Sequence, residues 1–511
     1  MRRRDLLRGS TLLPLAMVPL PGTYSLAAAA APPPLPDEPS GFDGSTVRGI
    51  ARELASKPYQ APDATLPEAY AKLSYDQYRA IRFDPGQALW RGAGVPFEVQ
   101  LFHRGFLYTD RVDIYEVADG KARALRYRPE LFDLGGQTPP TGDLGFAGFR
   151  IHAPLNRHDV LDEICAFLGA SYFRAVAKKQ GYGVSARGLA VKTGDPGGEE
   201  FPVFKAFWLE RPQPRAGSVV VHALLDGPSA AASFRFTIRP GEETLFDVET
   251  VIYPRSDIAQ LGLAPMTSMF YFGPNDRKRV DDYRSAVHDS DGLAIWTGWS
   301  EQLWRPLTNP AALQISSFSD VNPRGFGLVQ RRHDFVAYND LEARYERRPS
   351  LWAETIGNAG QGAVQLVEIP TNREIHDNIV AFWRPAEPLR AKTEFVFNYR
   401  LHWCWDRPAE GDVARVVATG SGAAGAEKTR LFVIDFSGDR LKQAAGETRL
   451  RADVSGDHGK IGNVVAQPNP EINGWRVSFE LSPSGSAVEL RAQLFAGDRA
   501  VSEAWLYRWT A

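Results

Sequence analysis

Residues 264–390 interleave carboxylates, arginines and aromatic rings, a mixture that suits chemistry on a sugar. Acid–base work on a glycosidic bond requires one carboxyl group to protonate the leaving oxygen and another to activate the attacking group. The segment carries no long run of one charge, so it does not have the pattern of a merely solvated surface. Six carboxylates are candidates for this work: Asp289, Asp291, Asp320, Asp340, Glu342 and Asp377.

Local context separates these candidates only in part. Turn, capping or ion-pair signals beside four of them give ordinary structural explanations, for Asp291, Asp320, Asp340 and Glu342. The dipeptide His-Asp decides nothing, because it occurs at 158–159, 288–289, 333–334 and 376–377. Asp377 is the least easily explained as a turn residue, because the apolar run from Ile379 to Trp383 follows almost directly. Partial desolvation there would raise the pKa of its carboxyl towards that of a general acid.

The elements that must position these residues are mostly strands. Stretches such as "GVPFEVQLFHRG" and "ASFRFTIRPGEETLFDVETVIYP" alternate apolar and polar residues between Gly, Asp and Pro turns, which predicts an all-β fold. Short helices are expected at residues 45–56 and 66–72, and a longer one at 161–179, "LDEICAFLGASYFRAVAKK". After a linker at 406–412, about seven evenly spaced short strands predict an immunoglobulin-like sandwich.

Several function classes lose their support. A G-x-G-x-x-G match at Gly420, Gly422 and Gly425 is followed by a strand instead of a helix, which favours a hairpin loop over a phosphate site. The sequence shows no Walker loop, no H-E-x-x-H and no G-x-S-x-G motif, and no cofactor or metal motif. Cys165 and Cys404 have no metal-ligand spacing, so two buried thiols are expected, with a disulfide left open.

The N-terminus indicates an exported protein. "RRDLLR" at residues 3–8, an apolar segment and Ala27–Ala31 follow the order of a twin-arginine signal peptide, expected over residues 1–31. The net charge is -2 for the 511-residue chain, which argues against a nucleic-acid partner. No apolar stretch after the leader is long enough for a membrane span, so none is expected.

Long motifs along nearly the whole mature chain resemble one family, the periplasmic glucan biosynthesis proteins G and D. Among them are "DLGFAGFRIHAPLN", "FLGASYFRA", "LAPMTSMFYFGPNDR", "HDSDGLAIWTG", "YNDLEARYERRPSLW" and "VEIPTNREIHDNIVAFWRP". The twin-arginine leader makes the chain look like the D branch. The resemblance implies a galactose-mutarotase-like β-sandwich at residues 40–405 and an immunoglobulin-like domain at 406–511.

The resemblance also implies a reaction and its residues. Members are expected to cleave linear β-1,2-glucan with inversion, or to transfer the chain and close it through an α-1,6 link. The general acid maps onto Asp377 and the base onto Asp289, which would act through a proton relay including Tyr345 and Arg348. No metal or cofactor is implied. A homodimer, and contact with other periplasmic glucan machinery, are further expectations for its partners.

Two questions stay open at this point. A non-catalytic glucan-binding or scaffold protein is the main alternative to the enzyme, and a sugar epimerase is a weaker one. Asp291 and four rings are expected to bind substrate, with core packing as the alternative for each ring: Trp299, Trp304, Trp352 and Trp383. The loops around Trp299-Ser300 and "TIGNAGQGAVQ" depart from the pattern of hydrolytic members, which predicts a changed acceptor side or relay.

Overall fold

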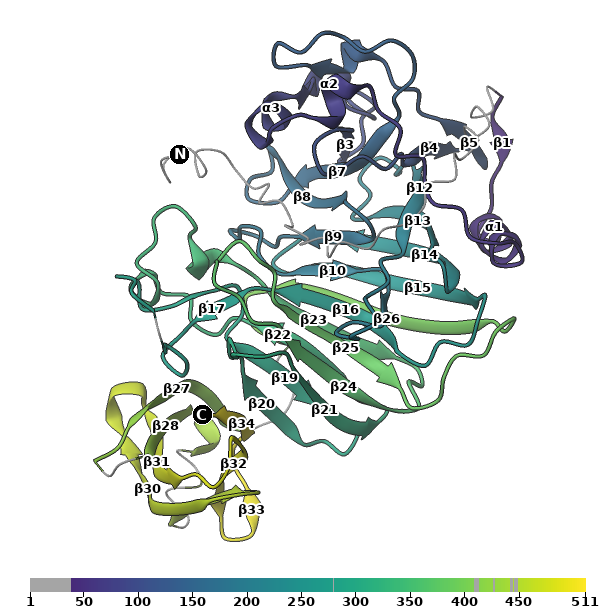
Figure 1. Cartoon of the computed structure of the whole chain (residues 1–511). Coiled ribbons are helices and arrows are strands. Elements are labelled where there is room, and N and C mark those ends of the chain that lie inside the picture. The colour runs from purple at the N-terminus through teal and green to yellow at the C-terminus, as the bar shows by residue number, and fades with distance from the viewer. Residues whose placement is uncertain (1–37, 279, 409–412, 426–427, 442–443, 445–448) are drawn as a thin grey trace.

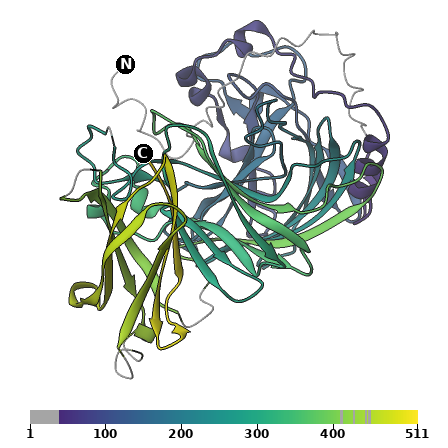
Figure 2. The same ribbon diagram turned by 60° about the horizontal axis from the view of Figure 1, so that its bottom comes forward.

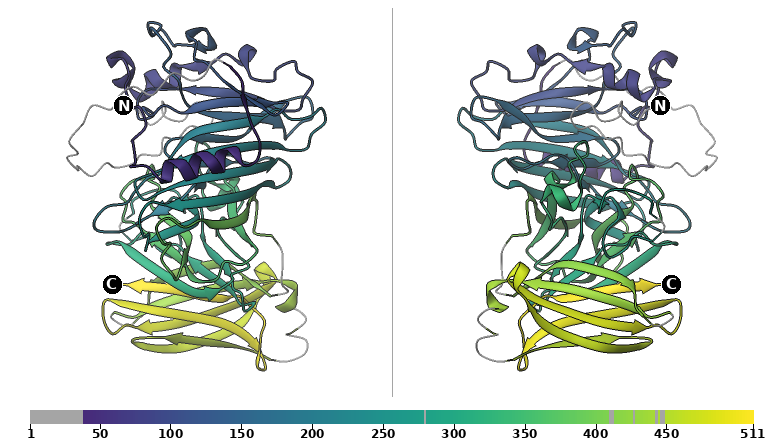
Figure 3. Two further views of the ribbon diagram at one scale, coloured as in Figure 1. Left: turned by 90° about the vertical axis from the view of Figure 1, so that its right-hand side faces the viewer. Right: turned by 90° about the vertical axis from the view of Figure 1, so that its left-hand side faces the viewer.

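The computed structural model describes residues 38–278, 280–408, 413–425, 428–441, 444 and 449–511. Strands dominate it (Figure 1), as predicted. The expected signal peptide lies outside the described residues. The described helices near the start of the chain are short: α1 (Thr46–Ala55), α2 (Glu68–Ala71) and α3 (Tyr75–Ala80). Helix α1 lies across the outer face of the largest sheet (Figure 3), where Val47 and Ala51 are buried against it. Single 3₁₀ turns are η2 (Pro85–Gln87), η3 (Pro129–Leu131), η4 (Phe335–Ala337), η5 (Tyr345–Arg347) and η6 (Pro470–Ile472).

One sheet runs through the whole molecule. In spatial order its strands are β1 (Ser40–Gly41), β5 (Lys121–Ala124), β4 (Asp113–Ala118), β12 (Val203–Glu210), β13 (Val219–Asp226), β14 (Ala230–Arg239), β15 (Thr244–Pro254), β26 (Phe395–Cys404), β23 (Ser350–Ile356), β22 (Gly325–Val329), β19 (Gly292–Trp296), β20 (Gln302–Pro306), β34 (Ala504–Thr510), β32 (Ala487–Ala496) and β29 (Leu450–Gly456), with β33 (Arg499–Ala500) paired to β32.

A second sheet faces the large part of the first. Its strands are β21 (Gln314–Val321), β24 (Gln361–Glu368), β25 (Ile379–Pro385), β16 (Leu261–Ser268), β10 (Ser185–Arg187), β9 (Tyr172–Ala175), β8 (Leu161–Leu168), β7 (Phe146–Pro154) and β3 (Glu98–His103), with β11 (Ala190–Val191) paired to β16. Buried apolar side chains of both sheets form one core, in which the rings of Phe167 and Phe207 lie 5.4 Å apart. Small pairs complete this part: β2 (Arg82–Phe83) with β6 (Phe132–Asp133), and β17 (Phe270–Phe272) with β18 (Val287–His288).

The C-terminal strands form a second, smaller sandwich (Figure 2). One layer is β27 (Arg415–Ala423), β28 (Arg430–Ser437), β31 (Gly474–Ser482) and β30 (Lys460–Asn469). The other layer, β34, β32 and β29, continues the large sheet through parallel pairing of Leu303 and Trp304 with Ala504 and Trp505. The two sandwiches therefore share a sheet. The expected boundary at 405/406 falls between β26 and β27 and stays a prediction.

Two local predictions were confirmed and one was wrong. Helices α1 and α2 lie inside the expected ranges 45–56 and 66–72. Residues 161–179 form strands β8 and β9 instead of a helix, with Gly169 and Ala170 at positive φ between them. The glycine motif lies at a β27–β28 hairpin, and Cys165 and Cys404 are buried and unpaired.

Candidate active site

Asp377 lies two residues before β25, and the residue between them fixes the chain there. Asn378 is 2% exposed, and its side-chain oxygen accepts a hydrogen bond from the Phe270 amide at 2.8 Å. Its side-chain nitrogen donates to the carbonyls of Phe270 and Ile369, both at 3.0 Å. The three bonds tie the start of β25 to β17 and to the end of β24, so the Asp377 carboxyl is held on an ordered backbone.

The environment of Asp377 favours the protonated carboxyl. Burial first, and the nearby Asp289 charge second, raise the pKa of Asp377 to about 6. Arg174 and Arg348 oppose this rise. Its side chain nevertheless remains partly exposed, so a ligand can reach it. A carboxyl with this pKa, accessible to solvent and held in place, suits a general acid.

Asp289 lies between β18 and β19 and is held by Arg348. It is 4% exposed, and Arg348 Nη1 donates a hydrogen bond to its Oδ1. Burial raises the pKa of Asp289, and the adjacent guanidinium opposes the rise by favouring the carboxylate. Arg348 Nε is buried and has no hydrogen-bond partner among the described residues.

Tyr345 connects the Asp289–Arg348 pair to the loop that carries Asp377. It opens the turn η5, and the Arg348 guanidinium lies 4.4 Å from its ring centroid. Its hydroxyl donates to Glu374 Oε2 at 3.4 Å, three residues before Asp377. Segments around 289, 345 and 377, distant in sequence, thus converge on one place.

A cation that the sequence reasoning missed also belongs to this cluster. Arg174, on β9, lowers the pKa of both Asp289 and Asp377 by its charge. Its guanidinium lies 5.5 Å from the ring centroid of Tyr182, and it forms no hydrogen bond or ion pair within the described parts of the chain. Arg174 belongs to the family motif "FLGASYFRA", but the helix predicted over residues 161–179 gave no reason to place it near the carboxylates.

The remaining carboxylates have structural roles. Asp340 accepts hydrogen bonds from the amides of Glu342 and Ala343 and pairs with Arg284 at 2.7 Å. Asp320 accepts from the Gly298 amide at 3.0 Å. Neither leaves its carboxylate unpaired, and Glu342 is exposed.

Three of the four tryptophans expected to stack on sugar are core residues instead. Their relative exposure is 3% for Trp304, 3% for Trp352 and 1% for Trp383. Each lies on an inner strand of a sheet whose faces are covered, so none presents a ring face to a ligand. Their burial favours the core-packing alternative over sugar stacking for these three.

Trp299 is 81% exposed but lies away from the acid cluster. It follows the end of β19, whereas Asp289 precedes its start, and a five-residue strand spans roughly 16 Å. The second departing loop, at 357–361, lies beside the first, because Gly360 bonds Asn322 and Arg324 bonds Trp296 through their backbones. Both loops therefore lie at the end of β19 that is remote from Asp289. Their position does not favour a direct change of the expected proton relay.

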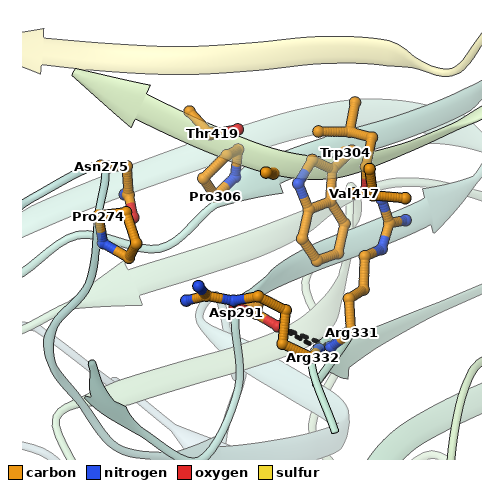
Figure 4. Close-up of a pocket in the computed structure, with 11 residues that line it drawn as sticks. Pro274, Asn275, Asp291, Trp304, Pro306, Arg331, Arg332, Val417 and Thr419 are labelled. Carbon is orange, nitrogen blue, oxygen red and sulfur yellow. Dashed lines mark hydrogen bonds and ion pairs between the residues drawn. The ribbon is translucent and has the colours of Figure 1, made fainter. Parts of the chain in front are cut away.

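Asp291 faces the seam between the two sandwiches (Figure 4). It accepts hydrogen bonds from the amides of Arg331 at 2.6 Å and Arg332 at 3.2 Å. Burial would raise the pKa of Asp291, but His288, Arg332 and these amides outweigh it and hold the pKa below its usual value. It lines a cavity of about 50 Å³ beside Trp304, whose ring the Arg331 guanidinium covers at 3.5 Å. Its carboxylate is already satisfied, so the structure does not favour the expected substrate contact.

Within the described residues no group of three or more His, Cys, Asp or Glu side chains is arranged to hold a metal ion. No described helix is long and apolar enough to cross a membrane.

Comparison with known proteins places the chain in a family. The sequence model described as "Periplasmic glucan biosynthesis protein, MdoG" matches residues 42–509. A "Glucans biosynthesis protein G" of Rhodopseudomonas palustris (strain BisA53) is 58% identical over 512 residues, covering 100% of both chains. A protein of the same name from Bradyrhizobium diazoefficiens is 57% identical over 518 residues, covering 100% of both. One from Vibrio cholerae is 51% identical over 477 residues, covering 92% of this chain and 87% of the relative. These names do not confirm the D branch, which stays a prediction from the leader. The chain belongs to the MdoG family of periplasmic glucan biosynthesis proteins.

Proposed function

We propose that this protein is an anomer-inverting enzyme acting on linear β-1,2-glucan in periplasmic glucan biosynthesis. Asp377 is the general acid and Asp289 the general base. The observation that carries the proposal is the partly exposed Asp377 carboxyl, with its pKa raised to about 6, beside the Asp289–Arg348 pair. The substrate and the outcome of the reaction come from family resemblance.

The residues fit the two halves of an inverting displacement. Asp377 gives its proton to the glycosidic oxygen as the bond to the anomeric carbon breaks. The attacking hydroxyl, from water or from a sugar, bonds to the opposite face of that carbon. Its proton passes through a relay that includes Tyr345 and ends on Asp289.

Arg348 acts in this relay as a fixed cation. Burial would lower the pKa of Arg348, but Asp289 and Tyr345 raise it above its ordinary value. The guanidinium therefore stays protonated and orients Asp289. If a sugar hydroxyl replaces water as the nucleophile, the same residues perform transglycosylation, and inversion at a β bond gives an α link.

The first experiment incubates the leader-free protein with linear β-1,2-glucan and analyses the products by mass spectrometry. Shorter linear glucans indicate hydrolysis, and products lighter than linear glucans by one water indicate cyclising transfer. Asp377→Asn is expected to abolish either activity with the fold retained. Asp159→Asn is the matched control, because it changes an exposed His-Asp carboxylate and should leave turnover intact. Full activity of Asp377→Asn refutes the assignment, and glucan binding without turnover in the parent indicates a binding or scaffold role.

We also propose export to the periplasm by the twin-arginine route through residues 3–8. The test fuses residues 1–40 to a reporter that is active only after export. Changing Arg3 and Arg4 to Lys should abolish export; unchanged export contradicts this route.

A further inference from the structure

A cavity of about 320 Å³ lies between the large sandwich and the C-terminal strands, separate from the cluster around Asp377. The large sandwich contributes polar side chains, including Asn275, Asp276 and Asn309. The C-terminal sandwich contributes Arg430 from the start of β28 and Trp509 near the end of β34. Its size lies at the lower end of the range for small-molecule sites.

The two walls are held at a defined separation. The Ser421 hydroxyl donates to the Asn275 carbonyl at 2.8 Å, and the Tyr507 hydroxyl donates to the same carbonyl at 3.1 Å. Lys278 Nζ donates to the Thr510 carbonyl at 3.0 Å. Bonds of this kind from both sandwiches make the cavity a pre-formed feature of the seam.

Three N–H donors of lining residues have no acceptor. They are buried and unpartnered within the described protein: Arg430 Nε, Arg508 Nε and Trp509 Nε1. Buried donors normally have acceptors, so three unpartnered donors on residues that line one cavity call for a ligand that supplies acceptor oxygens. The Arg430 side chain makes no hydrogen bond or ion pair among the described residues, and its charge opposes the burial that raises the pKa of Asp276.

We propose that this cavity is a second carbohydrate site, which binds a neutral hexose unit of the glucan chain at a distance from the reacting bond. Sugar hydroxyls are both donors and acceptors, and the walls offer both. Arginine and indole N–H groups donate, whereas the Asp276 carboxylate and the amide oxygens of Asn275 and Asn372 accept. A simple anion would match the arginines but meet the Asp276 carboxylate, so a neutral polyhydroxyl ligand fits better.

The cavity is lined in part by Thr371 and Asn372, which belong to the loop that carries Asp377. Asn309 accepts a hydrogen bond from the Thr371 amide at 2.9 Å and donates to its carbonyl at 2.8 Å. The Thr371 hydroxyl in turn bonds His376 Nδ1 at 3.0 Å, one residue before Asp377. Thr371 and Asp377 are six steps apart along the chain, so their Cα atoms are at most about 21 Å apart. A long glucan can therefore occupy both places, and occupancy of the cavity bears on the loop that carries the acid.

The test rests on the proposed function and uses the full mature chain with Asp377→Asn as the non-turning-over parent. Calorimetry compares a short linear β-1,2-gluco-oligosaccharide, sized for the acid site, with a long linear glucan. In this background, Arg430→Met should raise the Kd of the long glucan by about tenfold to a hundredfold, the effect of losing one charged hydrogen bond. The Kd of the short ligand should stay unchanged. The matched control is Arg390→Met, an arginine on the exposed surface that should change neither.

Trp509→Phe is a second variant, which removes the Nε1 donor and keeps a ring in the same place. It should also raise the Kd of the long glucan. Melting temperatures check that both variants are folded. Parent-like affinity of folded Arg430→Met and Trp509→Phe for the long glucan overturns the second site alone. A parent that binds neither ligand overturns the proposed function as well, so the two failures are distinguishable.

Discussion

Gly183 packs against the cation that orients the base, and adding one methyl group there tests that contact. A Cβ at Gly183 would lie 2.9 Å from Arg348 Cβ and 3.1 Å from its Cδ. The closer contact is about 0.6 Å below the shortest favourable carbon–carbon separation of about 3.5 Å. Its backbone φ is not in the left-handed region, so Gly183→Ala strains packing and not the backbone.

The displacement sets the expected size of the effect. A shift of about 1 Å at a catalytic group costs up to about a hundredfold in rate, so Gly183→Ala should lower kcat by about tenfold to a hundredfold. Overpacking should lower the unfolding free energy by about 1–3 kcal/mol. The expected loss is in kcat more than in KM, because Arg348 holds Asp289 rather than a distant sugar.

The assay measures turnover of linear β-1,2-glucan and thermal unfolding for two variants of the same loop. Gly181→Ala is the control, because nothing lies within 4 Å of its added Cβ, and its amide still donates to the Arg347 carbonyl. It should behave like the parent in both measurements. Parent-like kcat in Gly183→Ala would refute the reasoning that Arg348 must keep its place.

Four further predictions concern the same cluster. Tyr345→Phe keeps the ring beside Arg348 but loses the hydroxyl, so kcat should fall about a hundredfold or more with unchanged melting temperature; unchanged kcat would remove Tyr345 from the relay. Because the acid must be protonated, kcat/KM should fall as pH rises through about 6, and a flat profile there contradicts Asp377 as the acid. Arg174→Met removes a charge that lowers the pKa of Asp377, so this fall should move to higher pH. The raised pKa also means that the folded state binds this proton more tightly than the unfolded state. Stability from Asp377 is therefore lost as pH rises from 3.8 to about 6, and Asp377→Asn should gain unfolding temperature relative to the parent above that range but not below it.

Strand content was predictable where one face of a strand is more exposed and the residues alternate with a period of two, as in the first half of β15. Strand β8 has no such signal: its residues Ile164–Phe167 are all buried, so both faces are apolar. A continuous apolar run is compatible with a helix or a strand, and the pairing of β8 with β7 and β9 decides between them. Neighbours distant in sequence therefore overrode the local pattern, and Arg174 was missed with it.

The tryptophans show the same limit. Composition indicated many rings, but a ring on a strand faces either a ligand or another layer, and only the second sheet determines which. Trp383 is buried because the core of both sheets covers it, whereas Trp299 is exposed because it lies in a turn. Residue type carries no information about that difference.

The sequence by itself determined the strand-rich fold and the family, and it supplied the residues proposed as acid, base and relay. Motifs consist of residues close together in the sequence, so they can be recognised without the tertiary structure. Tertiary structure decided what depends on distance and dielectric: that Arg348 contacts Asp289, that burial and Asp289 together raise the pKa of Asp377, and that Arg174 acts on both carboxyls. It also decided that Asp291 is satisfied by backbone amides and that the two sandwiches enclose a polar cavity. These properties arise from charges and surfaces brought together across hundreds of residues, and their energies depend on separation and burial, which no spacing in the sequence encodes.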